Sequence, residues 1–217
     1  MATPILSQVC RANMLILGQK QALIDALLSR HASPQKAREM FQSICPMVGS
    51  SVGMHLRHSM DHIENASLAA HDAYVSPSNH TYSEIHYDLR TRGGVDESNI
   101  DEARKRIIRV QDILEEVKHQ CDLILERDLS ALHQDALHGK HPVQAYFFLS
   151  GVAGSPEVGL SSTVARELGF AAHHAIHHLA IVKIIALNHA GLQESDLPMG
   201  FGRAPSTVRS IADFILI

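Results

Sequence analysis

The sequence has few of the features that mark several large classes of protein. Its three cysteines, Cys10, Cys45 and Cys121, lie far apart and form no C-x-x-C pair. An odd number without paired spacing argues against a disulfide framework and suits a reducing compartment. No apolar run approaches the roughly 20 residues of a membrane span, and the N-terminal segment lacks the basic and apolar regions of a signal peptide. We therefore expect a cytoplasmic protein that does not enter the membrane.

Other functional classes are excluded by what the charge and the motifs lack. The formal net charge is -4, and no dense basic stripe is present, so nucleic-acid binding is not indicated. P-loop, G-x-G-x-x-G and G-x-S-x-G motifs are absent, which removes the sequence case for nucleotide binding and for a serine-hydrolase nucleophile. The length of 217 residues and the apolar content of 45% fit one folded domain over residues 1–217.

Hydrophobic periodicity predicts four long helices, joined by loops of unequal length. They cover residues 5–30, 48–74, 100–128 and a stretch from 161 or 162 to 189, with a shorter helix at 35–45. Asn99 is the expected N-cap of the third long helix and Gly191 the expected stop of the last. This pattern predicts an all-α fold, an antiparallel four-helix bundle with a long crossover.

The loops and the C-terminal tail complete this expected fold. Residues 81–94 are polar and predict an ordered loop, and residues 129–159 are rich in loop-forming residues. Within the second loop, residues 143–151 are β-like and compatible with a small hairpin. The tail, residues 191–217, ends in an apolar patch and is expected to pack back on the bundle.

Histidine is the anomaly of the composition, with 16 residues against 19 lysines and arginines together. The last predicted helix holds two overlapping H-x-x-x-H pairs, His173 with His177 and His174 with His178. Residues four apart on a helix point to nearly the same side, so each pair can ligate one metal. The apolar stripe of this helix runs through Val164, Leu168, Ala171, Ala175, Ile181, Val182 and Ile185. His174 and His178 lie within that stripe, where buried imidazoles need partners, and we predict that they bind a metal.

A second group of histidines lies on the helix predicted at residues 48–74. His55, His58 and His62 recur at i, i+3 and i+7 along the edge of its apolar stripe. Periodicity favours His55 or His62 over His58 as the inward-pointing ring. Together the two helices offer three or four imidazoles. Three protein ligands with an open position are typical of a catalytic metal site, and neutral imidazoles suit Zn, Ni, Fe or Cu.

Both segments resemble motifs of the DinB-like (YfiT-like) superfamily of metal-binding proteins. Residues 51–58, Ser-Val-Gly-Met-His-Leu-Arg-His, resemble the family's first motif and place His58 at its ligand position. Residues 174–178, His-Ala-Ile-His-His, resemble the second motif and place His174 and His178 at the other two.

The resemblance spans most of the chain, roughly residues 5–190, in helix order and motif spacing. It implies a four-helix bundle with a three-His site for a divalent metal (Zn, Ni or Fe), often in a homodimer. Some relatives use low-molecular-weight thiols as cosubstrates of transferase or isomerase reactions, and a related domain supplies the iron ligands of sulfoxide synthases. On the first helix the resemblance selects His58, and we keep His62 as its rival.

Two further groups of polar residues have structural or functional interpretations. Glu167, seven residues before His174, is interpreted first as a helix N-terminal charge, with a general base or outer-shell acceptor as alternatives. Tyr87, Asp88, Arg90 and Arg92 form Y-D-x-R-x-R, which indicates a salt-bridged structural loop or a cover that holds a carboxylate substrate.

Three functional hypotheses follow. The first is a metal-dependent enzyme acting on a small molecule, such as a thiol-dependent transferase or a hydrolase, with His58, His174 and His178 as ligands. The second is a non-catalytic protein whose fold a metal stabilises through a closed four-His site, with His62 as the fourth ligand, because structural sites are usually saturated. The third is a helical bundle that binds no metal and associates through its apolar tail.

Overall fold

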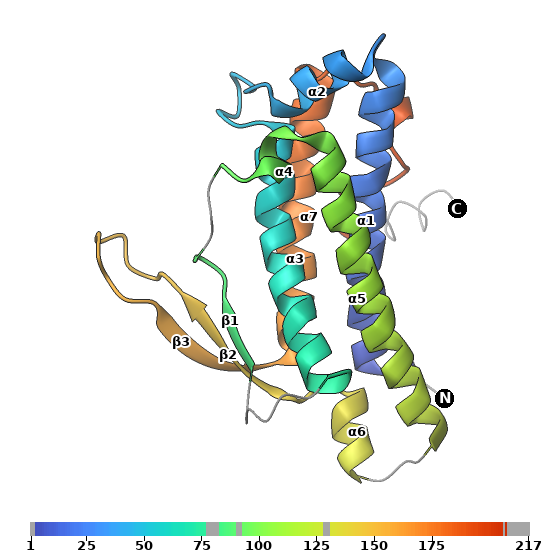
Figure 1. Ribbon diagram of the computed structural model, residues 1–217, viewed down its shortest axis with the longest axis vertical. Helices are drawn as coiled ribbons and strands as arrows, with labels where there is room; N and C mark the ends of the chain where they lie inside the picture. The colour runs from blue at the N-terminus through green and yellow to red at the C-terminus, as the bar shows by residue number, and fades with distance from the viewer. Residues whose placement is uncertain (1–2, 77–82, 90–92, 128–130, 206, 208–217) are drawn as a thin grey trace. The chain divides into compact units, whose positions relative to one another are not determined.

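The computed structural model describes residues 3–76, 83–89, 93–127, 131–205 and 207 of the 217-residue chain. Within these residues the protein is mostly helical and also contains a three-stranded sheet (Figure 1). The helices are α1 (Ile5–Arg30), α2 (Pro34–Gln42), α3 (Val52–Tyr74), α4 (Val95–Ser98), α5 (Ile100–Arg127), α6 (Ala131–Leu137) and α7 (Val164–Asn188), with a 3-10 turn η1 (Glu194–Asp196) after the last. The strands are β1 (Ser83–His86), β2 (Pro142–Phe147) and β3 (Val158–Thr163).

The four long helices confirm the prediction from periodicity, and local signals explain where they begin and end. Ser33 caps α2, where its side chain accepts a hydrogen bond from the backbone of Lys36. Asn99 caps α5 as predicted, because its side-chain oxygen accepts from two backbone N–H groups of the first turn. Gly191 follows α7 with a φ of +74°, a backbone conformation that glycine adopts without strain.

The sheet corrects the expectation of a purely α fold. The small hairpin expected near residues 143–151 is present as the antiparallel pair β2–β3, but β1 also pairs with β2, in parallel. Strand β1 lies inside the segment predicted to be an ordered loop. Its partner is about sixty residues further along the chain, and such long-range pairing leaves no local pattern in the sequence.

The described chain divides into two compact units, each built from separate stretches of sequence. The first unit comprises Met1–Leu15, Met60–Arg92 and Ile108–Ala172, and it contains the sheet. The second unit comprises Ile16–Ser59, Gly93–Ile107 and His173–Ile217. Each of the four long helices α1, α3, α5 and α7 contributes a segment to both units.

In the first unit, the sheet and segments of α1, α3, α5, α6 and α7 contribute to an apolar core. On β2, Val143 and Ala145 are buried, and on β1 Ile85 is buried. The side chain of Asn13 on α1 donates to the backbone carbonyl of Leu168 on α7 at 2.9 Å, which joins these two helices inside the core. Cys10 and Cys121 of this unit are buried free thiols, as is Cys45 of the second unit.

In the second unit, α3 begins against α4 with very little space between their backbones. A Cβ atom on Gly53 would overlap the carbonyl oxygen of Glu97 and lie 2.7 Å from Cε1 of Phe41. Only glycine fits this contact. An ion pair between Arg57 and Glu97, both largely buried, joins the same two helices. The second turn of α3, which carries His55 and His58, is thereby held in a fixed place within its unit.

The first part of the C-terminal tail belongs to the second unit and packs within it. Leu192 and Phe201 are buried, and the backbone N–H of Gly202 donates to the side chain of Gln19 on α1 at 3.1 Å. The apolar end predicted for the tail, residues 208–217, lies outside the described residues.

Helix α7 has the length and composition of a membrane-crossing helix. Its mean hydropathy reaches 1.4 over an 18-residue window, of which 39% is buried. Its histidines interrupt the apolar residues, so the helix contains no long uninterrupted apolar run. Core helices of soluble proteins meet the same criterion of length and composition, so α7 alone does not argue for a membrane.

Candidate metal centre

Helices α3 and α7 bring four histidines of the second unit together. The Nε2 atoms of His58 and His174 lie 3.2 Å apart, and the ring of His178 is 4.6 Å from that of His58 and 4.7 Å from that of His174, centroid to centroid. The Nδ1 atom of His178 also lies 2.9 Å from Nδ1 of His55. His178 is therefore close to each of the other three rings.

Three of these histidines fit a metal ion. His58, His174 and His178 each offer a ring nitrogen, and these nitrogens all lie within 4.8 Å of one another. Metal–nitrogen bonds of about 2.0–2.1 Å in a tetrahedral site place two nitrogens about 3.3–3.4 Å apart. The separation of 3.2 Å between His58 and His174 already matches that value, so small side-chain rotations close the set.

Burial and the neighbouring groups keep the ring of His178 neutral. Burial, followed by the neighbouring His58, His174, His55 and Lys20, lowers the pKa of His178 to about 3. Burial and then Lys20 lower the pKa of His55 as well. A neutral imidazole is the form that ligates a metal, so at neutral pH His178 needs no deprotonation before it can bind one.

Lys20 is a charged group that the sequence interpretation missed. Its side chain on α1 is fully buried, where its ammonium donates to the backbone carbonyl of Leu56 at 3.5 Å and contacts the hydroxyl of Ser59. The signal was present, because Lys20 lies four residues after Ile16 and three before Leu23 on the apolar face of α1. A lysine inside an apolar stripe is rare unless it has polar partners.

The remaining candidate histidines are not members of this cluster. His62, the predicted rival of His58, belongs to the first unit, where its ring stacks on Tyr87 with centroids 4.7 Å apart. It is not one of the three histidines whose nitrogens converge among the described residues. His173 and His177 are exposed and lie edge to face with each other at 4.9 Å. His174 and His178, the pair predicted to face inward, are half-buried.

Glu167 is both a helix N-terminal charge, as predicted, and the centre of a buried network in the first unit. It lies in the first turn of α7 and is fully buried. Its carboxylate accepts hydrogen bonds from Tyr87 at 2.8 Å, Ser162 at 2.5 Å and Arg166 at 2.6 Å. Burial and then Glu167 raise the pKa of Tyr87, so the phenol stays protonated and donates.

For Tyr87 and Asp88, the first two residues of Y-D-x-R-x-R, the contacts favour a structural role. Tyr87 is buried against Glu167, and the carboxylate of Asp88 accepts from the backbone of Phe148 at 2.9 Å. Both contacts are structural. Arg90 and Arg92 lie outside the described residues.

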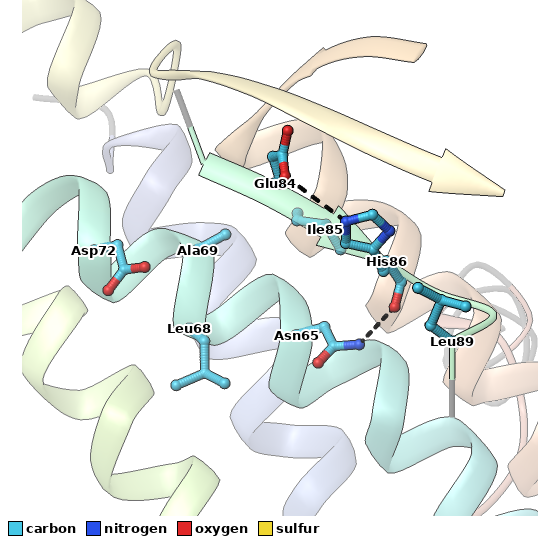
Figure 2. A pocket seen from close by; sticks show the side chains of 8 residues that line it. All are labelled: Asn65, Leu68, Ala69, Asp72, Glu84, Ile85, His86 and Leu89. Atoms are coloured by element: carbon cyan, nitrogen blue, oxygen red, sulfur yellow. Dashed lines mark hydrogen bonds and ion pairs between the residues drawn. The ribbon is translucent and has the colours of Figure 1, made fainter. Parts of the chain in front are cut away.

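The first unit also has a pocket of about 290 Å³ between α3 and β1, which Figure 2 shows from close by. Its lining combines apolar side chains with two carboxylates, an amide and an imidazole: Asn65, Leu68, Ala69, Asp72, Glu84, Ile85, His86 and Leu89. The amide of Asn65 donates to the backbone carbonyl of His86 at 3.2 Å, and Nδ1 of His86 pairs with Glu157 at 2.6 Å. His86 is therefore already engaged, and the pocket has no arrangement of ligands comparable to the histidine cluster.

Comparisons with known proteins give one distant similarity. The chain is 29% identical over 169 residues to FK506-binding protein 5 of Rhizopus delemar, which covers 75% of this chain and 37% of that protein. The chain thus spans little more than a third of the length of this relative, whose name attributes FK506 binding to that protein. No family model matches the chain, and no solved structure matches it. The resemblance to the DinB-like superfamily therefore stays a prediction.

Proposed function

We propose that this protein is a divalent-metal-dependent enzyme of the DinB-like kind that acts on a small molecule. His58, His174 and His178 are its metal ligands. The observation that carries the proposal is the convergence of three ring nitrogens, from two helices, within 4.8 Å.

The chemistry of the donors supports a catalytic rather than a purely structural metal. The cluster offers three imidazoles, and catalytic metal sites in proteins typically have three protein ligands and one open position. Held by these three histidines, Zn, Ni or Fe would lower the pKa of a water or thiol and make it a nucleophile at neutral pH. Three residues of this chain would hold the metal, and one of them, His178, stays neutral because burial and neighbouring charges lower its pKa.

The reaction class rests on the resemblance alone. It points to a transferase that uses a low-molecular-weight thiol, or to a hydrolase. The same resemblance supports the finer description of the fold as an antiparallel four-helix bundle, and also a homodimer. The chain itself supports the bundle through its four long helices, each of which contributes to both units.

The alternative is a metal that only stabilises the helices. This alternative requires a closed site, for which His62 was the expected fourth ligand. The stacking of His62 on Tyr87 in the first unit disfavours it. A closed site also predicts that no external ligand reaches the metal, whereas an open site predicts that small ligands bind and change its spectrum.

The test is the metal content of protein purified without an affinity tag or chelator. We expect about one equivalent of metal in the wild type and almost none in His174→Ala, because a three-ligand site does not survive the loss of a ligand. His173→Ala is the matched control, since His173 is exposed and adjacent in sequence. It should retain the wild-type content. A wild type that contains no metal, and takes up none from Zn, Ni or Fe(II), would contradict the proposal.

A further inference from the structure

His55 lies beside the proposed ligands without being one of the three that converge. Its Nδ1 faces Nδ1 of His178 at 2.9 Å, with the rings 5.2 Å apart and tilted by 43°. This is a hydrogen bond between two imidazoles. Two neutral rings can make it only if one Nδ1 carries a proton and the other does not.

The two ways of placing that proton have opposite consequences for metal binding. If His55 donates, His178 carries its own proton on Nε2 and accepts with Nδ1, so neither of its nitrogens has a lone pair for a metal. If His178 donates, its proton is on Nδ1 and its Nε2 lone pair is available. Only the second arrangement agrees with His178 as a ligand.

We propose that His55 is the positioning residue of the metal centre, accepting a hydrogen bond from Nδ1 of His178 and so presenting Nε2 of His178 to the metal. This inference rests on the proposed function. Ligand histidines in metal sites usually donate their second N–H to a carboxylate, a carbonyl or a water, which fixes the ring and its tautomer. Here the imidazole of His55 is the acceptor in place of a carboxylate, a carbonyl or a water.

The second ring nitrogen of His55, Nε2, must be considered in both arrangements. This nitrogen is buried and has no hydrogen-bond partner among the described residues. When Nδ1 of His55 accepts, this Nε2 carries a buried N–H that no described residue accepts, and when Nδ1 donates, the same Nε2 is a buried acceptor without a donor. The cost therefore arises in either arrangement and does not choose between them. Metal binding makes the choice, because only a proton on Nδ1 of His178 leaves its Nε2 lone pair for the metal.

The backbone of α3 holds His55 in place for this role. The backbone N–H of His55 donates to the carbonyl of Ser51 at 3.3 Å, and the hydroxyl of Ser59 donates to the carbonyl of His55 at 2.9 Å. The ring therefore projects from a regular helical turn whose start is locked by the close contact at Gly53. An acceptor on a rigid element restricts the orientation of the ligand ring opposite it.

The test compares Zn²⁺ affinity, by competition with a chromophoric chelator, among variants that keep or remove the acceptor. His55→Phe keeps a planar ring without an acceptor, and we expect its affinity to fall about 10- to 100-fold, the usual effect of losing an outer-shell partner. His55→Asn restores an acceptor near the position of Nδ1 and should recover most of the affinity. His177→Phe, at an exposed position of α7, is the control and should bind as the wild type does.

A second readout uses the wild-type protein, so it does not depend on the folding of any variant. In the Zn²⁺-loaded protein, ¹⁵N NMR of the histidine rings should show a protonated Nδ1 and a ligated Nε2 on His178. A ligated Nδ1 on His178, a ligated His55, or wild-type affinity in His55→Phe overturns the inference while leaving the metal site intact. Absence of Zn²⁺ binding in the wild type is a different result, because it removes the proposed function itself.

Discussion

Replacing Gly53 by alanine should destabilise the protein, although the same change at most helical positions stabilises it. Alanine is favoured over glycine inside a helix by about 1 kcal/mol. At Gly53, however, the new methyl group overlaps the backbone carbonyl of Glu97 and lies 2.7 Å from Phe41. Overpacking of this kind costs about 1–3 kcal/mol, and a backbone atom yields less than a flexible side chain. The upper part of that range applies, which leaves a net loss of about 1–2 kcal/mol.

The control is the same substitution on α1. A Cβ on Gly18 meets nothing within 4 Å, so Gly18→Ala should stabilise the protein by about 0.5–1 kcal/mol. Thermal unfolding followed by circular dichroism measures both. With about 2–4 °C per kcal/mol for a chain of this size, we expect Tm to fall by about 2–8 °C for Gly53→Ala and to rise by about 1–4 °C for Gly18→Ala. Equal rises in the two variants would refute the close contact between α3 and α4.

Two further predictions concern titratable groups. Because burial and neighbouring charges lower the pKa of His178 from 6.5 to about 3, the unfolded metal-free chain takes up a proton between these values that the folded chain does not. Stability present above pH 6.5 is therefore lost as the pH falls towards 3; urea midpoints measured across this range should decline, and a flat profile would contradict the burial of this ring. Tyr87→Phe removes one of three donors to the buried carboxylate of Glu167 and should cost about 1.5–3 kcal/mol. A urea midpoint equal to that of wild type would show that the bond contributes nothing.

The long helices could be predicted because their signals are local. The bounds of α1 agree with periodicity at both ends, and α5 was predicted to within one residue. The start of α3 was placed four residues too early, at Val48, which is the one apolar residue of the segment 48–51. There a short bridge between Cys45 and Ser50 closes a turn in which Gly49 has a φ of +71°. That turn depends on backbone pairing that no helical pattern reports.

The sheet and the short helix α6 could not be predicted from local pattern. Strand β1 has only four residues and forms by pairing with β2 far along the chain. Residues 161–163 were assigned to the start of the last helix, but they pair with β2 as the end of β3. Helix α6 lies in a segment rich in loop-forming residues. In each case contacts distant in sequence outweighed local propensity.

The histidines of α7 could be selected from local periodicity, but those of α3 could not. Periodicity alone selected His174 and His178 on α7, because both lie inside a clear apolar stripe. On α3 periodicity favoured His55 or His62, whereas the ring that converges with the α7 pair is His58. Angle around a helix tells which side faces the core. It does not tell which rings meet the neighbouring helix, and here both His58 and His55 contact histidines of α7.

X-ray absorption at the metal edge of the purified, loaded protein tests the three-histidine centre most directly. The account predicts three imidazole nitrogens at about 2.0–2.1 Å plus one or two lighter ligands from solvent. It also predicts that the imidazole contribution is lost or halved in His178→Ala. A spectrum without imidazole scattering, or one that is identical in wild type and His178→Ala, would contradict it.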